Sequence, residues 1–177
     1  RGRDYAPASR RRRQIGALGM SGAKESHMRR ALALARQGMN GNSGGPFGAV
    51  VVKDGRIVGE GFNRVTSTND PTAHAEIVAI REACKALGTF DLSGAEIYAS
   101  CEPGPMCLAA IYWARIGRIY YGNTREGAAR IGFDDDHIYR EFAVPMERRA
   151  IPMERMLETD AAADFAAWMK KADKVRY

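Results

Sequence analysis

Two short stretches decide how this chain folds: Thr72-Ala73-His74-Ala75-Glu76 and, further along, Cys101-Glu102-Pro103-Gly104-Pro105-Met106-Cys107. Apolar residues recur at helical spacing after each stretch, so each is expected to lie where a helix begins. The free N–H groups and the positive dipole end of a helix start favour a cysteine thiolate, which is the form that binds metal. His74, Glu76 and Cys107 are therefore candidates for a metal site.

The spacing of the second stretch is suited to zinc. Residues three apart at a helix start share one face, so positions 104 and 107 would both face a bound metal. His74 would add a neutral nitrogen ligand from a neighbouring helix. Three protein ligands leave the fourth zinc position to water, as in catalytic sites. Zinc would lower the pKa of that water, and Glu76 could move its proton to a leaving amine.

Strand and helix patterns alternate along the rest of the chain. Helices are expected at 24–37, 73–87, 105–114, 124–131 and 159–171, and strands at 47–52, 57–62, 96–100, 118–121 and 153–157. Asp54-Gly55 is a strong marker of a hairpin between the first two strands. The pattern predicts an α/β fold with a mixed sheet covered on both faces, and ligands gather at the strand ends and helix starts of such sheets.

The length of 177 residues suits one domain, and the composition is that of a globular protein. The net charge is +6, but six arginines and one aspartate give residues 1–20 a charge of +5. We interpret 1–20 as a basic disordered tail or the remnant of an added segment, and 21–177 as one folded domain that carries the expected metal site; a targeting or RNA-binding arm is the alternative for the tail. A body of charge +1 is not expected to grip a phosphate backbone.

The cysteines and the apolar runs indicate where the protein works. Three cysteines form no disulfide framework, and the basic start has no apolar core typical of a secretory signal. Both observations favour the cytoplasm. No apolar run approaches the ~18 residues of a membrane helix, so no membrane partner is expected.

Several longer stretches carry a resemblance to a known family: Gly44-Gly45-Pro46-Phe47-Gly48-Ala49, residues 69–76, residues 110–115, Gly132-Phe133-Asp134-Asp135 and the final Lys174-Val175-Arg176-Tyr177. From about Lys24 to Tyr177 the chain resembles the zinc-dependent cytidine-deaminase superfamily, and within it the bacterial guanine deaminases. The resemblance implies a three-layer α/β/α domain with a five-stranded sheet. It also implies hydrolysis of guanine, a small-molecule purine base, to xanthine and ammonia.

The same resemblance assigns roles to individual residues. It makes His74 and Cys107 ligands of one zinc ion per chain, Glu76 the proton shuttle, and Asp135 a second acid at the guanine amine. It places the substrate against a set of five residues: Phe47, Asn63, Ala75, Trp113 and Tyr177. It further implies a homodimer that exchanges C-terminal segments, so that Tyr177 closes the partner's site.

Gly104 departs from the family pattern, because it stands where a zinc-ligand cysteine belongs. Glycine cannot coordinate through a side chain, which leaves open whether zinc is absent, weakly bound, or held by His74, Cys107 and water. Cys101 lies before the helix, where the family carries a cysteine that is not a ligand. Cys84 is ten residues beyond His74 on one helix, about 15 Å along its axis, so neither is expected to substitute.

The sequence keeps several functions open beside guanine deamination. One alternative is a deaminase of cytosine, isocytosine or guanosine, and another is a transfer-RNA adenosine deaminase anchored by the arginine-rich tail. A zinc-free, non-catalytic protein of the same fold is supported by Gly104 alone. The remaining residues of the expected site are all present, which favours an active enzyme.

Overall fold

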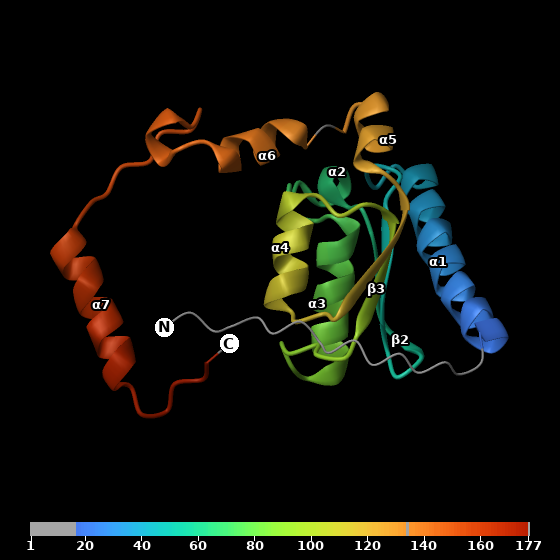
Figure 1. Cartoon of the computed structure of the whole chain (residues 1–177), viewed down its shortest axis with the longest axis horizontal. Coiled ribbons are helices and arrows are strands. Elements are labelled where there is room, and N and C mark those ends of the chain that lie inside the picture. The colour runs from blue at the N-terminus through green and yellow to red at the C-terminus, as the bar shows by residue number, and fades with distance from the viewer. Residues whose placement is uncertain (1–16, 134, 177) are drawn as a thin grey trace.

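The computed structural model describes the backbone of residues 17–133 and 135–176, and side chains from residue 22 onward. Four strands form one mixed sheet in the order β2-β1-β3-β4: β1 (Gly48–Lys53), β2 (Arg56–Phe62), β3 (Glu96–Cys101) and β4 (Arg118–Asn123). Helix α1 (Ala17–Asn40) covers one face, while α3 (Ala75–Leu87) and α4 (Pro105–Trp113) cover the other (Figure 1). This is the predicted three-layer α/β/α arrangement.

The first two strands form the predicted hairpin. Asp54 and Gly55 both have positive φ, 51° and 74°, as the favoured two-residue hairpin turn requires. Strand β3 then pairs antiparallel with β1 and parallel with β4, which makes the sheet mixed. The parallel pair is connected by α4, so the start of that helix lies where β3 ends.

Alternate residues of the central strands build a core on each face of the sheet. Val50 and Val52 point toward α1, where they pack with Ala31, Leu34 and the fully buried Tyr98. The opposite residues belong to a larger cluster beneath α3 and α4: Ala49, Val51, Ala75, Ala79, Ile80, Ala83, Leu92, Ala95, Ile97, Ala99, Ile111, Ala114 and Ile116. Both helices that carry the expected site are thus fixed to the sheet by buried apolar contact.

Two glycines let α3 lie close against β2. An ideal Cβ at Gly61 would stand 2.4 Å from the carbonyl oxygen of Ala75, and one at Gly59 would stand 2.2 Å from that of Ala79. Both distances are below any real contact, so side chains there would push the helix away from the sheet. The glycines therefore set the position of the first turn of α3, which carries Glu76.

The prediction of a fifth strand at 153–157 was wrong. In the described part of the chain, residues 152–157 have no regular structure and no strand partner. The segment lies away from the body, where Ile151 is 79% exposed and Met156 is 75% exposed. Three elements were also missed: α2 (Val65–Thr68), α6 (Asp136–Ala143) and the short 3-10 turn η1 (Met146–Arg148). Helix α2 and the turn η1 are too short to show apolar periodicity. Helix α6 does carry such a signal, because Ile138, Tyr139 and Phe142 recur at helical spacing, and the prediction overlooked it.

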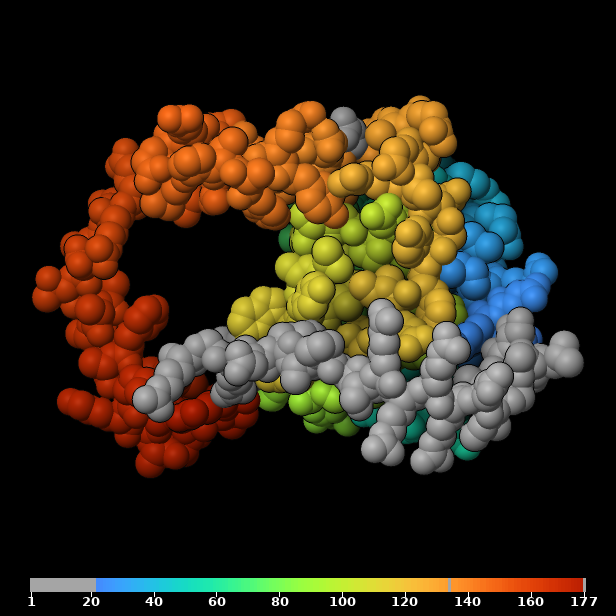
Figure 2. All heavy atoms as spheres, in the orientation of Figure 1, coloured from blue at the N-terminus to red at the C-terminus, as the bar shows by residue number. Residues whose placement is uncertain are grey.

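The chain after α5 (Arg125–Arg130) forms an arm that leaves the body. Helices α6 and α7 (Glu158–Lys170) contain no buried residue. Figure 2 shows open space between the red end of this arm and α4. Among the described helices, none has both the length and the apolar character that crossing a bilayer requires.

Most of the predicted tail, residues 1–16, lies outside the described residues. Helix α1 begins at Ala17, so the last four residues of the expected tail, 17–20, are helical backbone. The division of the chain into a tail and one domain remains a prediction.

Candidate active site

The two stretches singled out in the sequence meet at one point of the fold. The ring Nδ1 of His74 lies 3.5 Å from Sγ of Cys107, and Cys107 Sγ lies 3.4 Å from Oε2 of Glu76. Donor atoms of these three residues all lie within 4.8 Å of one another, and no other such group of three or more occurs in the described part of the chain. His74, Glu76 and Cys107 therefore form a candidate metal centre.

Helix starts place each of these side chains. His74 is the N-cap residue of α3, with an extended backbone, and Glu76 follows in the first turn. Cys107 is in the first turn of α4, which has Gly104 as its N-cap and Pro105 at its first helical position. Proline suits that position because its missing N–H would have no helical partner there. Two helix starts thus converge on one site, as the sequence indicated.

Burial changes the proton affinity of this group. Glu76 is 8% exposed and Cys107 is 1% exposed. Loss of hydration raises the pKa of the Glu76 carboxyl above its usual value. Burial, with the nearby Glu76 carboxylate as the second cause, also raises the pKa of the Cys107 thiol. Without a metal, both groups therefore hold protons more firmly than in water.

The donor set fits a zinc ion in chemical type. Imidazole nitrogen, thiolate sulfur and carboxylate oxygen are the three donors that zinc takes from proteins. Where the family pattern has a second cysteine, the space beside Gly104 holds a carboxylate: an ideal Cβ at position 104 would stand 2.0 Å from Oδ2 of Asp135. The site thus presents an imidazole, a thiol and carboxylates.

A cavity of about 720 Å³ opens over this group, a size typical of small-molecule sites. Its walls come from the loop after α1, the start of α3, the end of β3 and the segment before α6. The lining residues are Met39, Asn42, Gly44, Gly45, Phe47, Asn63, Val65, Thr66, Pro71, His74, Glu76, Cys101, Glu102, Gly104, Ala128, Phe133 and Asp135. Five of the predicted site residues, Phe47, Asn63, His74, Glu76 and Asp135, lie on one wall or another of this cavity.

Asn63 is held in a fixed orientation within the cavity wall. Its side chain is 4% exposed, and Oδ1 accepts a hydrogen bond of 3.1 Å from the backbone N–H of Val65. Its own backbone N–H donates to the carbonyl oxygen of Phe47 at 3.0 Å. Because Oδ1 is engaged, the amide NH₂ is the group that Asn63 offers to a ligand.

Two phenylalanines form an apolar part of the cavity wall. The rings of Phe47 and Phe133 meet edge to face, with centroids 4.8 Å apart and planes at 89°. Such a pair offers a flat apolar surface to a planar ring. Phe133 was not among the predicted site residues, although it precedes Asp135 by two positions in one of the stretches that carried the resemblance.

Two predicted substrate residues, Trp113 and Ala75, are not brought to the cavity of this chain. Trp113 lies at the end of α4, is 66% exposed and is not among the cavity-lining residues. The side chain of Ala75 is buried in the core beneath α3 instead. Tyr177 lies outside the described residues. Trp113 therefore does not form a wall of the cavity within one chain.

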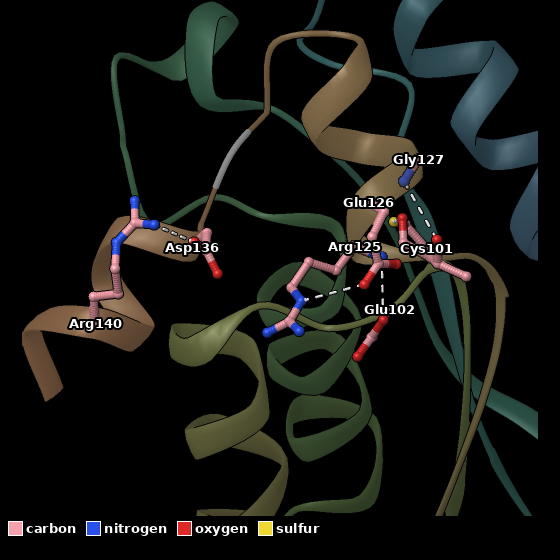
Figure 3. A network of polar contacts seen from close by, with 8 residues as sticks. Cys101, Glu102, Arg125, Glu126, Gly127, Asp136 and Arg140 are labelled. Carbon is pink, nitrogen blue, oxygen red and sulfur yellow. Dashed lines mark hydrogen bonds and ion pairs between the residues drawn. The ribbon is translucent and has the colours of Figure 1, made fainter. Parts of the chain in front are cut away.

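The other two cysteines are engaged elsewhere, as expected. The thiol of Cys101 donates to the carbonyl oxygen of Thr124 at 3.5 Å, away from the metal group. Next to it, Glu102 accepts a 3.1 Å hydrogen bond from the backbone N–H of Arg125 (Figure 3). These bonds fasten the end of β3 to the start of α5. Cys84 packs against the core beneath α3.

Residues 21–123 match the cytidine and deoxycytidylate deaminase zinc-binding region, and the chain belongs to this family of proteins. It is 51% identical over 153 residues to the guanine deaminase of Bacillus subtilis, and the match covers 86% of this chain and 98% of that relative. The crystal structure of guanine deaminase from Bacillus subtilis superposes with a TM-score of 0.84. The predicted resemblance is confirmed.

Further relatives mark the range of the family. A solved structure of guanine deaminase from Nitrosomonas europaea is 33% identical, with a TM-score of 0.60, and covers 63% of this chain and 65% of its own. The tRNA-specific adenosine deaminase of Agrobacterium fabrum is 52% identical, but only over 89 residues, which are 49% of this chain and 59% of that relative. A solved structure of a tRNA:A34 deaminase is 42% identical, with a TM-score of 0.57, and covers 73% of this chain and 95% of its own. Both matches to transfer-RNA deaminases cover less of this chain than the 86% covered by the Bacillus guanine deaminase.

Proposed function

We propose that this protein is a hydrolytic deaminase that converts the free base guanine to xanthine and ammonia. The observation that carries the proposal is the match to the Bacillus guanine deaminase, which extends over 98% of that relative and includes the arm that follows α5. The cavity above His74, Glu76 and Cys107 has a volume typical of small-molecule sites.

His74 and Cys107 would hold one zinc ion per chain in this proposal, through Nδ1 and Sγ respectively. Zinc, when bound, lowers the pKa of a water molecule and so supplies a nucleophile at neutral pH. The family to which the chain belongs is defined by a zinc-binding region, and the donor types at the site agree with that metal.

Glu76 is the residue that we assign to proton transfer. Hydrolysis of guanine forms a C2–O bond, breaks the C2–N bond of the amino group, and moves both protons of one water. One proton goes to the ring nitrogen beside C2 and the other to the departing amino group, which leaves as ammonia. A buried carboxyl with a raised pKa holds a proton more firmly than an exposed one and can pass it on to the substrate, which suits this double transfer.

Asn63 and the phenylalanine pair would fix the base in the cavity. The NH₂ of Asn63 can donate to the carbonyl oxygen or to a ring nitrogen of guanine, while its Oδ1 remains bonded to Val65. Phe47 and Phe133 offer apolar surface to the purine ring. The role of second acid for Asp135 stays a prediction, because Glu76 alone can carry both protons in succession.

Product analysis tests the proposed reaction. The full chain, loaded with zinc, is incubated with guanine in water enriched in oxygen-18, and products are identified by mass spectrometry. We expect equal amounts of ammonia and xanthine, with one labelled oxygen at C2. Absence of xanthine from a chain with bound zinc would reject the proposal, and chelator-treated protein is the control.

Deamination of adenosine in transfer RNA is the second candidate, since the Agrobacterium relative has that name and 52% identity over its matching part. It would require residues 1–20 to anchor RNA, because the remaining residues carry a net charge of only +1. RNA binding that weakens steeply with salt and disappears when residues 1–20 are removed would favour this candidate over guanine.

A homodimer that exchanges C-terminal arms is part of the proposal. The arm carries large apolar side chains that face solvent in one chain, among them Phe165 at 78% exposed and Leu157 at 73% exposed. The body has exposed aromatic residues too, with Trp113 at 66% and Tyr121 at 51%. Apolar surface of this extent on two separate parts of one chain is typical of an interface.

The exchange would carry the C-terminal arm of one chain to the body of the other and place Tyr177 near the partner's cavity. Among the described strands, β4 lies at one edge of the sheet, where such an arm would find unpaired backbone groups. A twofold arrangement would give both chains the same contacts.

The three cysteines support a reducing compartment, and we place the protein in the cytoplasm. All three are free thiols in the structure. Proteins of oxidising compartments generally pair such residues in disulfides.

A further inference from the structure

The carboxylate of Asp135 fills the space in which a side chain at position 104 would begin. An ideal Cβ built on Gly104 lies 2.0 Å from Oδ2 and 3.1 Å from Cγ of Asp135. Non-bonded atoms separate by about 3.5–4.0 Å, so the first distance is far inside contact. The carboxylate oxygen of Asp135 therefore occupies the place in the cavity where a ligand side chain at position 104 would lie.

Asp135 does not use its carboxylate in the way its position would suggest. It is the N-cap residue of α6, where aspartate normally accepts a hydrogen bond from the first turn. Its side chain makes no such capping bond. Only its backbone carbonyl is engaged with the helix, by the N–H groups of Ile138 and Tyr139. The carboxylate lies instead on the wall of the cavity that Gly104 also lines.

Charge balance gives an independent reason for a carboxylate at this place. A histidine with two thiolates brings two negative charges to a divalent ion. With Gly104, the thiolate of Cys107 supplies only one of them, and the carboxylate of Asp135 would restore the second. Zinc takes carboxylate oxygen at about 2.0–2.2 Å and thiolate sulfur at about 2.3 Å, so either donor serves at nearly one distance.

We propose that Asp135 is the third protein ligand of the metal in this chain, in place of a side chain at position 104. The inference rests on the proposed metal-dependent function. Asp135 lies outside the group of donors within 4.8 Å of one another, so its carboxylate moves from Gly104 toward His74 and Cys107 when metal binds. A ligating Asp135 is not free to act as a second acid, which leaves both proton transfers to Glu76.

Metal titrations without any base test this inference. Zinc affinity of the full chain is measured by competition with a chromophoric chelator, and cobalt absorption spectra report the ligand set. Loss of second-shell partners alone costs 10–100-fold in affinity, so loss of a ligand in Asp135→Ala should cost at least about 100-fold. Asp135→Glu, which keeps a carboxylate, should recover part of the loss and part of the spectrum.

The Gly104→Cys background makes the test specific. There a thiolate takes the third position, so Asp135→Ala should change zinc affinity little or not at all. Asp136→Asn is the matched control in the original background, because the Asp136 carboxylate pairs with Arg140 at 2.6 Å (Figure 3). It should leave affinity unchanged. Circular dichroism checks folding, and Asp135→Asn replaces Asp135→Ala where the latter fails to fold.

Four results would overturn the inference. The first is unchanged zinc affinity in Asp135→Ala, and the second is an equal loss of zinc affinity on Asp135→Ala in the original and the Gly104→Cys backgrounds. The third is a loss of zinc affinity in Glu76→Gln that Asp135→Ala does not show. The fourth is zinc binding that is detected only after Gly104→Cys. Guanine turnover is scored separately. A chain that binds zinc through Asp135 and does not turn over guanine would contradict the proposed function and leave the ligand assignment intact.

Discussion

The thiol of Cys107 donates a hydrogen bond to the carboxylate of Glu76, and both groups are buried. In the metal-free site, the thiol proton therefore lies between Cys107, the proposed metal ligand, and Glu76, the proposed proton-transfer residue. Metal binding must remove the thiol proton, because the thiolate is the ligand form. The bond also explains why Glu76 belongs to the same cluster as the ligands without being expected to act as one.

Replacement of Glu76 by glutamine should abolish most of the activity and keep the metal. Glutamine preserves the shape of the side chain but cannot carry a proton, and general acid–base groups contribute about 10²–10⁴-fold to rate. We expect kcat for xanthine formation to fall within that range, with zinc stoichiometry unchanged. Retention of more than a tenth of the activity would show that another residue transfers the protons.

The same variant should stabilise the metal-free chain at neutral pH. Burial raises the folded-state pKa of Glu76 above its ordinary value of 4.5, so the folded state favours the protonated carboxyl. The stability that this group gives is fully present below pH 4.5 and is lost as pH rises through the folded-state pKa. Thermal melts of chelator-treated protein should show this loss in the parent and not in Glu76→Gln. Parallel pH profiles for the two proteins would contradict the assignment.

Two substitutions at Asn63 should separate its structural role from its substrate role. Asn63→Ala removes the acceptor of the Val65 N–H, and an unsatisfied buried donor costs about 1–3 kcal/mol of stability. Asn63→Asp keeps that acceptor and loses the NH₂ donor. We expect both variants to lose guanine turnover and only Asn63→Ala to lose a comparable amount of stability in denaturant unfolding. Full activity in Asn63→Asp would exclude a donor role.

Substitution of Phe165 should disrupt the assembly if arms are exchanged. In a monomer this residue is 78% exposed, and exposed substitutions normally change stability by no more than about 0.5 kcal/mol. In a dimer its replacement by serine should shift sedimentation toward the monomer and reduce activity. Asp164→Ser, on the preceding position of α7, is the control. A monomeric parent protein with full activity would reject the exchange.

Most of the helices and strands of the body could be predicted from the sequence, because the pattern of apolar residues there follows which side chains are buried. The strands at 48–53 and 96–101 are each buried at five of six positions between two layers of helix, and α3 has a wide apolar face. In the arm, the helix expected at 159–171 is confirmed as α7 (Glu158–Lys170), but the packing of the arm could not be predicted in this way. Its apolar residues, such as Ile151 and Met153, face solvent in one chain, so their pattern reports no core within that chain.

The candidate metal centre was predicted from the sequence, and the other residues of the cavity were predicted less well. His74, Glu76 and Cys107 lie at helix starts that have clear sequence signals, and they meet as expected. Gly104 and Asp135 lie side by side although they are 31 positions apart, with α4, β4 and α5 between them, and no local pattern encodes that contact. The place of Phe133 in the cavity wall was missed, because a single phenylalanine in a polar turn does not indicate which aromatic ring it will contact.

The most direct test of the central claim is a comparison of kcat/KM for guanine, guanosine, cytosine, isocytosine and a transfer-RNA anticodon stem, with one zinc-loaded preparation. We predict turnover of guanine, with guanosine slower because the match is to a deaminase of the free base. A protein that contains zinc and turns over cytosine or the RNA stem but not guanine would contradict the account.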